Sequence, residues 1–275
     1  MLHHQSSVLF IGAGQIASEV SAYLRSSPFN CLGFSRRPNH STRNLSWRTA
    51  DELAQIYSPS AVVFTLTPQG SDAHSYKQSY LNSLAHWLNT PALQTAKQII
   101  WISSTRVYGH NDGSVVDQST PAQPRDTQGN ILLHCETLLL NAAPKHSLAL
   151  RFPGLYGKQQ HFENRLARLR SSPKAQAWPP RWENRLHRTD AAGLIAHCIE
   201  NNITSTSPMI TSDIAPSTQW ETASWLANQL KIPLEPADHS ASRGKRIVSD
   251  VHSTFGYRLQ YPTWHHGYRA LINQI

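Results

Sequence analysis

The feature that most constrains the fold is a pair of glycines near the N-terminus, followed at a fixed spacing by an alanine. Gly12, Gly14 and Ala17 come directly after an apolar, β-prone run at 8–11. Residues 16–24 then carry apolar side chains at helical spacing, and a second apolar run follows them. Strand, glycine turn, helix and strand is the context that the spacing G-x-G-x-x-G/A requires. The sequence therefore predicts a dinucleotide-binding βαβ unit.

Each small residue of this turn has a physical role. Gly12 permits the tight turn, and Gly14 lets backbone N–H groups approach a pyrophosphate at the positive end of a helix. Ala17 lets the helix pack closely on the strand. We therefore expect the pyrophosphate to contact the backbone of Gly12, Gly14, Gln15 and Ile16.

The end of the second predicted strand bears on the choice of cofactor. An NAD-binding unit usually carries an acidic residue there, which holds the ribose 2′-hydroxyl. This chain has Ser35, Arg36 and Arg37 instead. A hydroxyl and a guanidinium attract a 2′-phosphate, whereas a carboxylate repels it. We therefore predict NADP(H), with NAD(H) possible, and the alternative is that the arginines are solvated loop charges.

The balance of charge agrees with an anionic ligand. Lys and Arg number 25 against 17 Asp and Glu, which gives a formal net charge of +8 over 275 residues. The basic residues are spread thinly and form no run typical of a nucleic-acid tail. We therefore expect a small-molecule substrate and no nucleic-acid partner.

Cysteine and histidine spacing predicts neither disulfides nor a metal site. The three cysteines lie far apart, and the paired histidines at 3–4 and 265–266 lack acidic or cysteine partners at ligand spacing. The first residues carry neither a basic nor a long apolar stretch, so no signal peptide is predicted. No segment approaches the ~18 apolar residues of a membrane span. We expect a cytoplasmic protein without a membrane partner.

Strands and helices alternate through the first part of the chain. The predicted elements are strands at 60–67, 98–102 and 148–151 and helices at 76–88 and 131–140. Alternation of this kind predicts an α/β fold with a Rossmann-type, doubly wound parallel sheet. Residues beside the third strand, Thr65, Leu66 and Thr67, are expected near the adenine and ribose.

The pattern changes after Gly157. Residues 158–188 are basic and rich in Trp and Pro. Beyond them we predict helices at 190–199, 217–230 and 265–272 and strands at 208–212 and 245–249, with Thr218 and Glu221 as a capping box. We therefore predict a dinucleotide-binding domain at 1–157 and a small C-terminal α/β substrate lobe at 158–275, with the helix at 190–200 packing back on the first domain.

In the order of these motifs, nearly the whole chain resembles the NAD-dependent epimerase/dehydratase group of the extended short-chain dehydrogenase/reductase superfamily. The resemblance rests on five segments: GAGQIA at 12–17, SSTRVYG at 103–109, LRFPGLYG at 150–157, LHRTDAAGLIAHCIE at 186–200 and FGYRLQYPTWHHG at 255–267. It implies an NAD(P)-dependent oxidoreductase or epimerase.

Site residues follow from the resemblance position by position. The serine of S-S-x-x-V-Y-G that is catalytic in the family is Ser104 here, and the loop at 152–155 would flank the nicotinamide. Residues before the helix at 190–199 would reach the substrate. The remaining residues that the resemblance implies are Ser103, Pro153, Gly154 and Leu155 for the cofactor and Thr105, Tyr156, Arg185, His187 and Arg188 for the substrate.

One departure from the family stands out. Dehydrogenases of this family carry Y-x-x-x-K on the helix after the Asp/Gly loop, where Tyr is the general acid/base and Lys lowers its pKa. If the family's following Glu corresponds to Glu136, Gln128 stands in place of Tyr and Leu132 in place of Lys. No tyrosine lies between Gly109 and Leu155. The chain thus resembles atypical members that lack the pair.

Other candidates each have a structural alternative. Tyr108 and His110 are weak candidates for a substitute acid, and Ser104 either orients a substrate or satisfies backbone groups at a strand end. His134 is expected to pack among apolar residues. Trp178 and Trp182 line a substrate pocket or fill the space between lobes.

Two functions remain open on this sequence. The first is an NADP(H)-dependent, epimerase-like oxidoreductase that acts on a small polar or anionic substrate. The second is a non-catalytic NADP(H) sensor, which the missing Tyr/Lys pair favours. The resemblance implies a monomer or a homodimer formed through the helices at 76–88 and 129–142.

Overall fold

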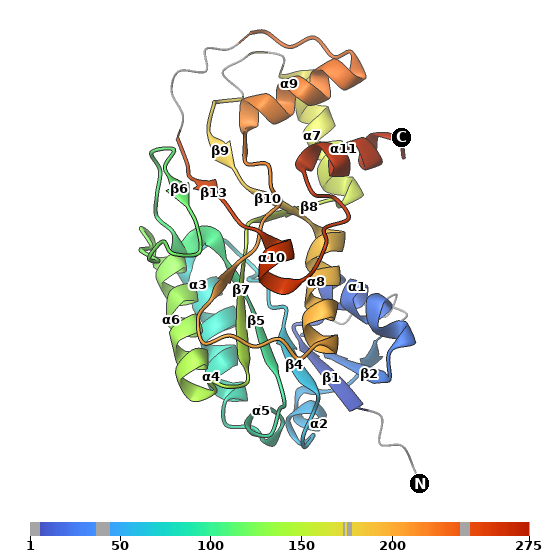
Figure 1. The fold of residues 1–275 in the computed structure, drawn as a ribbon, viewed down its shortest axis with the longest axis vertical. Helices are drawn as coiled ribbons and strands as arrows, with labels where there is room; N and C mark the ends of the chain where they lie inside the picture. The colour runs from blue at the N-terminus through green and yellow to red at the C-terminus, as the bar shows by residue number, and fades with distance from the viewer. Residues whose placement is uncertain (1–5, 37–44, 173, 175–177, 237–242, 275) are drawn as a thin grey trace. The chain divides into compact units, whose positions relative to one another are not determined.

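A computed structural model of the chain describes residues 6–36, 45–172, 174, 178–236 and 243–274 (Figure 1). These residues form two compact units that interleave along the chain. The first comprises residues 1–108, 122–152 and 191–209, and the second comprises 109–121, 153–190 and 210–275. Residues 191–200 thus belong to the first unit, although residues before and after them belong to the second.

A seven-stranded sheet forms the centre of the first unit, with the order β3-β2-β1-β4-β5-β7-β11. The five pairings from β3 to β7 are parallel. The strands span β1 Ser6–Ile11, β2 Phe29–Phe34, β3 Ser46–Trp47, β4 Ala61–Phe64, β5 Ile99–Ser104, β7 Ser147–Phe152 and β11 Met209–Ile210. The Rossmann-type parallel sheet that the sequence predicts is therefore confirmed, and its order reverses between β1 and β4.

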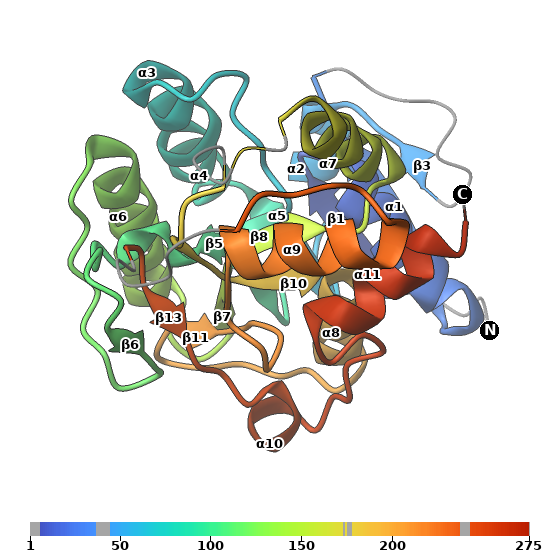
Figure 2. The ribbon, with the colours of Figure 1, turned by 90° about the horizontal axis from the view of Figure 1, so that it is seen from above.

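Helices cover both faces of this sheet, as a doubly wound fold requires (Figures 1 and 2). One face packs on α2 Ala50–Ala54, α4 Ser83–Trp87, α5 Pro91–Gln94 and α6 Thr127–Ala142 through a continuous apolar core. On the other side lie α1 Gln15–Tyr23 and α8 Arg188–Glu200. The side chain of Gln98, at the start of β5, donates hydrogen bonds to the carbonyls of Cys198 and Ile203 at 2.9 and 2.7 Å. These bonds fix the end of α8 to the sheet.

The central strands are apolar because both of their faces are buried. β4 is buried at all four positions, and β7 at all six. Continuous apolar runs of this kind are typical of parallel strands covered by helices on both sides.

The helix expected at 76–88 is present but is not α-helical throughout. α3 Ala73–Tyr76 continues into a π-helical segment, η2 Lys77–Asn82, before α4 begins.

A capping box begins α2. The Thr49 side chain accepts from the Glu52 amide at 3.2 Å, and the Glu52 carboxylate accepts from the Thr49 amide. Asp51 lies inside the first turn of this helix.

The second unit packs three helices around its own apolar core. They are α7 Gln159–Ser171, α9 Gln219–Leu230 and α11 Trp264–Ile272. Three two-stranded pairs complete the unit: β8 Gly154–Tyr156 with β10 Arg185–His187, β9 Trp182–Glu183 with β12 Ser217–Thr218, and β6 Val115–Val116 with β13 Arg246–Ile247. A short helix, α10 Val251–Phe255, begins at its cap Asp250.

The capping box predicted for α9 is present. The Thr218 side chain accepts from the Glu221 amide at 3.0 Å, and the Glu221 carboxylate accepts from the Thr218 amide at 2.7 Å. Helix α7 was not predicted, although its buried residues Phe162, Leu166 and Leu169 have helical spacing. Its basic, polar composition hides this narrow stripe.

Candidate functional site

The glycine turn between β1 and α1 is held by two neighbouring strands. Gly12 adopts a positive φ of 82°, and its amide and that of Ala13 donate to the carbonyl of Phe34 at 3.0 and 2.7 Å. The Thr65 hydroxyl donates to the Gly12 carbonyl at 3.1 Å. A Cβ at Gly12 would lie 2.8 Å from a methyl carbon of Leu66. Thr65 and Leu66 therefore shape the turn, and their expected place near the adenine and ribose stays a prediction.

The space around Gly14 is less crowded than the space around Gly12. Among the described residues, a Cβ at Gly14 would meet only the Gly12 carbonyl oxygen, at 3.8 Å, and Gly14 has a negative φ of −118°. Gly14 is also the N-cap of α1, and no side chain caps this helix among the described residues. The amides of the first helical turn, at Gln15 and Ile16, thus point from an uncapped helix N-terminus, which is a suitable place for an anion.

Polar residues gather at the same edge of the sheet. The end of β2 lies beside the end of β1, with Phe34 paired to Ile11, so Ser35 and Arg36 follow next to the glycine turn. Arg36 is exposed, and its guanidinium donates to the hydroxyl of Ser79 at 3.3 Å. Ser79 lies in the π-helical segment η2 and is buried. Arg37 lies outside the described residues, and Thr67 is exposed after β4.

A buried charged network joins β5, β7 and α6. Glu136 receives hydrogen bonds from Arg151 at 2.6, 3.0 and 3.2 Å and from the Ser103 hydroxyl at 2.5 Å. Arg151 also donates to the Tyr108 hydroxyl at 2.6 Å and lies 5.0 Å from the centre of its ring. All four side chains are buried. Ser103 and Tyr108 therefore serve the interior of the first unit in this structure, and Tyr108 does not present its hydroxyl to solvent.

Ser104 follows at the end of β5, where it is half-buried. Its hydroxyl oxygen accepts from the Arg106 amide at 3.2 Å and so caps a short 3₁₀ turn at Thr105–Val107. Arg106 in turn pairs with Asp126, the cap of α6, at 3.0 Å. The backbone role that the sequence left open for Ser104 is therefore present, and its hydroxyl proton stays available to a ligand. Thr105 is buried.

The positions of the missing Tyr and Lys have other uses here. The Gln128 side chain is half-buried and donates to the Ser71 carbonyl at 2.7 Å. Leu132 is buried in the apolar face of α6. His134 is exposed on the same helix, so the expectation that it packs among apolar residues was wrong.

Apart from Thr105, which belongs to the first unit, the residues that the resemblance assigned to the substrate lie in the second unit. β8 and β10 are parallel, with Arg185 opposite Gly154 and His187 opposite Tyr156. The rings of Tyr156 and His187 meet edge to face at 5.0 Å. Burial lowers the pKa of His187 to about 4, so its ring is neutral near pH 7. Pro153 and Leu155 lie in the same segment and Gly154 is exposed.

Arg185 donates to the Ser217 hydroxyl at 2.7 Å and pairs with Glu183. Two further charged residues of this unit, Asp213 and Arg165, were not singled out by the sequence. Asp213 is buried, one carboxylate oxygen has no partner among the described residues, and burial raises its pKa to about 7. Arg165, on α7, lies 3.9 Å from Glu183, and burial lowers its pKa. No local motif marks these groups, which only the folded unit brings together.

The remaining candidates are placed as follows. Trp178 is buried in the core of the second unit, with Arg165 and Arg168 over its ring at 5.5 and 4.3 Å. His110 is half-buried, and its Nδ1 has no hydrogen-bond partner among the described residues. Trp182 lines a pocket of the second unit together with Trp220, Trp225 and Trp264.

Neither a metal centre nor a membrane span is found in the described parts of the chain. Within them, no three His, Cys, Asp or Glu side chains are grouped so that they could hold a metal ion. None of the helices there is long and apolar enough to cross a membrane.

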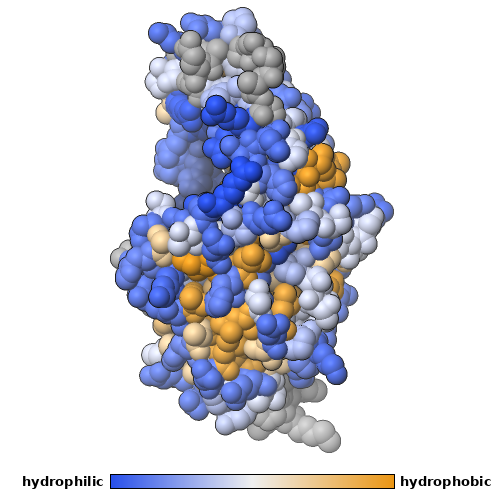
Figure 3. Space-filling view, turned by 90° about the vertical axis from the view of Figure 1, so that its left-hand side faces the viewer, coloured by the Kyte–Doolittle hydropathy of each residue, from blue (hydrophilic) through white to orange (hydrophobic). Residues whose placement is uncertain are grey.

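Figure 3 shows an apolar area on one face of the first unit. It is seen from the side on which α6 lies in Figure 1, and α6 carries the half-buried apolar residues Ile131, Leu133, Leu138 and Leu140. This helix is one of the two through which the resemblance implies a homodimer, which stays a prediction.

Comparisons with known proteins agree on the fold. No family model matches the chain. Protein YeeZ of Escherichia coli K12 is 30% identical over 112 residues, which are 41% of this chain and 40% of YeeZ. The match therefore spans well under half the length of this relative.

Solved structures match over almost the full length. A putative NAD-dependent epimerase/dehydratase from Methylobacillus flagellatus has a TM-score of 0.77 at 27% identity, with 98% of each chain covered. MoeE5 in complex with UDP-glucose and NAD has a TM-score of 0.76 at 21% identity, again with 98% of each chain covered. Human epimerase family protein SDR39U1 with NADPH has a TM-score of 0.74 at 17% identity over 98% of this chain and all of that chain (100%). The chain has the NAD-dependent epimerase/dehydratase-like fold of the extended short-chain dehydrogenases/reductases.

Proposed function

We propose that this chain binds NADP(H) at the glycine turn and acts as an epimerase/dehydratase-like protein on a small polar or anionic substrate. The observation that carries the proposal is the open space over Gly14 at the uncapped N-terminus of α1. This N-terminus lies where the strand order reverses between β1 and β4. Ligands of open α/β sheets bind in the crevice at such a point.

The residues present fit a dinucleotide. Amides at Gly14, Gln15 and Ile16 would receive the pyrophosphate, and the segment at 65–67 would lie beside the adenosine. Ser35 and Arg36 would receive a 2′-phosphate, because Arg36 is exposed and no carboxylate precedes it at the end of β2. Proteins of this fold have been solved with NAD and with NADPH, so the choice rests on this chain's own residues.

Replacement of Gly14 by valine should abolish dinucleotide binding and leave the fold intact. The φ of Gly14 is negative, and among the described residues a Cβ there would meet only the Gly12 carbonyl oxygen, at the ordinary contact distance of 3.8 Å. A branched side chain there would occupy the place of the pyrophosphate. We expect the affinity for NADPH, measured by calorimetry, to fall at least about 100-fold, since several charge-assisted hydrogen bonds are lost.

Gly12→Ala is the matched control for this experiment. It strains a positive φ and brings a Cβ to 2.8 Å from Leu66, so it should lower the melting temperature. Gly14→Val should leave the melting temperature of the ligand-free protein nearly unchanged. Unaltered NADPH affinity in Gly14→Val would mean that the turn has only a packing role.

Replacement of Arg36 by aspartate should weaken NADPH binding and spare NADH binding. The carboxylate repels a 2′-phosphate and can accept a hydrogen bond from a 2′-hydroxyl. We expect the ratio of the two dissociation constants to change by about 10- to 100-fold, from the loss of a charged hydrogen bond. Lys97→Asp makes the same charge change just before β5, at the amino-terminal ends of the strands, whereas the glycine turn follows the carboxyl end of β1. It should leave the ratio unchanged. If both variants changed the ratio equally, Arg36 would act only through the net charge of the protein and not through a contact with the 2′-phosphate.

The second candidate function is an NADP(H) sensor without hydride transfer. Gln128 and Leu132 support it, because the amide has no titratable proton and the buried leucine carries no charge. When bound, the nicotinamide supplies the hydride chemistry. Of the chain's own groups, Ser104 would orient a carbonyl or hydroxyl of the substrate, and Arg185 and His187 would contribute to recognition in the second unit.

A further inference from the structure

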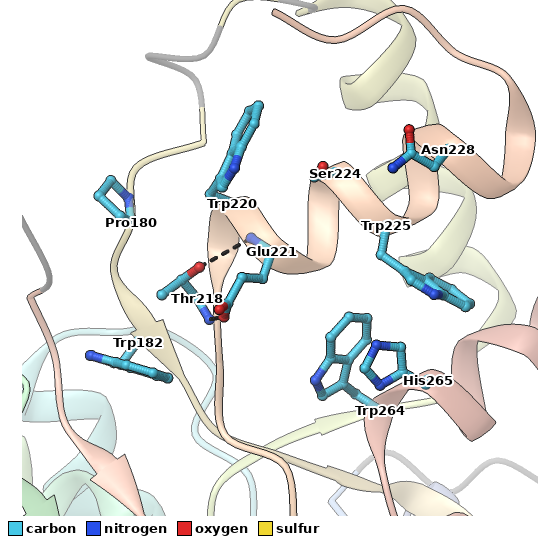
Figure 4. A pocket seen from close by; sticks show the side chains of 10 residues that line it. All are labelled: Pro180, Trp182, Thr218, Trp220, Glu221, Ser224, Trp225, Asn228, Trp264 and His265. Atoms are coloured by element: carbon cyan, nitrogen blue, oxygen red, sulfur yellow. Dashed lines mark hydrogen bonds between the residues drawn. The ribbon is translucent and has the colours of Figure 1, made fainter. Parts of the chain in front are cut away.

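A pocket of about 530 Å³ opens in the second unit (Figure 4). One face of α9 forms its floor, with Glu221, Ser224 and Asn228 in successive turns. Its walls come from four tryptophans. They are Trp182, Trp220, Trp225 and Trp264, and the rest of the lining is Pro180, Thr218 and His265.

The aromatic rings are held in fixed positions. Trp264 stacks on His265 at 3.5 Å, and Trp225 meets both rings edge to face at 5.6 and 5.3 Å. Trp182 has Arg246 over its ring at 5.3 Å, so this indole already takes part in one cation–π contact. A pocket of this size and lining is suited to a metabolite-sized ligand.

The charge of the lining points to the sign of the ligand. Among the described residues that line the pocket, Glu221 alone carries a carboxylate, and one of its oxygens accepts from the Thr218 amide at 2.7 Å in the capping box. The other oxygen has no hydrogen bond to a described residue. Burial, and then the neighbouring His266 and Arg269, lower the pKa of His265 although Glu221 acts in the opposite direction, so this ring is largely neutral near pH 7. Figure 4 shows the carboxylate between Trp182 and Trp264.

We propose that this pocket binds an organic cation, an alkylated ammonium carried on a small apolar frame. A tryptophan ring attracts a cation more strongly than any other side-chain ring, and aromatic cages recognise quaternary ammonium groups. The free carboxylate oxygen of Glu221 pairs with the same charge. An anion would meet the carboxylate unfavourably, and a neutral ligand would cover it without pairing its charge.

The chain offers a local readout for this proposal. It has eight tryptophans, of which four line the pocket, so each indole N–H gives a separate signal in a ¹H–¹⁵N spectrum. The signals are assigned with single Trp→Phe variants. The full-length protein is then titrated with choline chloride, with sodium chloride at equal concentration, and with 3,3-dimethylbutan-1-ol, which has the shape of choline without its charge. D-glucose serves as a neutral polyol.

Two matched variants separate charge from structure. Glu221→Gln removes the charge and preserves the capping box, in which glutamine is equally accepted. Glu52→Gln makes the same change in the capping box of α2, far along the chain and in the other unit. The position of the four pocket signals in the ligand-free spectra reports that each variant is folded.

We expect choline to shift the pocket indoles with a dissociation constant on the order of millimolar, in the unmodified protein and in Glu52→Gln. Binding should be about tenfold weaker for the neutral isostere and for Glu221→Gln, which is the range of a partly desolvated cation–π and charge contact. The proposal is overturned if choline leaves these signals in place, if the isostere or glucose binds as well as choline, or if Glu221→Gln binds as tightly as the unmodified protein.

Discussion

Replacement of Glu136 by alanine is expected to lower the free energy of unfolding by about 3–5 kcal/mol, because it leaves a buried arginine without its partner. The Glu136 side chain is 1% exposed and that of Arg151 is 8% exposed, and they are joined through three hydrogen bonds. Removal of the carboxylate also deprives the Ser103 hydroxyl of its acceptor. Urea unfolding monitored by circular dichroism measures the change.

Two further variants test the reason for this loss. Glu136→Leu combined with Arg151→Met replaces the whole pair by apolar side chains and should be much less destabilising than Glu136→Ala, since no charge stays buried. Asp51→Ala removes an exposed carboxylate from α2 and should change stability by no more than about 0.5 kcal/mol. A loss below about 1 kcal/mol for Glu136→Ala would show that Arg151 finds another partner or reaches water.

Turnover of nucleotide-sugar and secondary-alcohol substrates is expected to be very slow even with NADP(H) bound. Reduction of a carbonyl needs a proton donor for the alkoxide that develops, and a missing general acid costs about 10²- to 10⁴-fold in rate. Gln128 has no such proton, and its side chain is engaged with Ser71. Tyr108 is buried against Arg151, so it is poorly placed to supply the proton.

Stopped-flow nicotinamide absorbance over a panel of such substrates measures this rate, with Ser104→Ala beside the unmodified protein. Residual turnover should fall further in Ser104→Ala if this hydroxyl orients the substrate. Gln128→Tyr adds the family's acid at a half-buried position and is the better test of rescue. Leu132→Lys would place a charge at a buried site and risk the fold. Fast turnover that is indifferent to Ser104→Ala would place the chemistry on other residues.

Features encoded by a short stretch of chain were predictable from the sequence. The glycine turn, the central strands and the capping box at Thr218 each depend on residues a few positions apart, and the structure contains all three. The parallel order of the sheet follows from the same alternation of strands and helices. This local information was enough for the fold class, whereas the assignment of the cofactor residues stays a prediction.

Features that depend on distant residues were not predictable in the same way. The hydrogen bond from Arg36 to Ser79 joins residues that are 43 positions apart. Ser79 lies in the π-helical segment at 77–82, which was not predicted from the sequence. Asp213 and Arg165 carry no local motif, and their altered pKa values come from burial in the folded unit. The tryptophan pocket likewise joins segments from 180 to 265, and only tertiary packing brings them together.

The central claim is that the glycine turn binds a dinucleotide, with a preference for the phosphorylated one. Calorimetric titration of the unmodified protein with NADPH and with NADH tests it most directly. We expect both to bind and NADPH to bind at least about tenfold more tightly, because Arg36 contributes a charged hydrogen bond to the 2′-phosphate alone. Tighter binding of NADH would contradict the assignment of Ser35 and Arg36, and the absence of heat from either dinucleotide would contradict the claim as a whole.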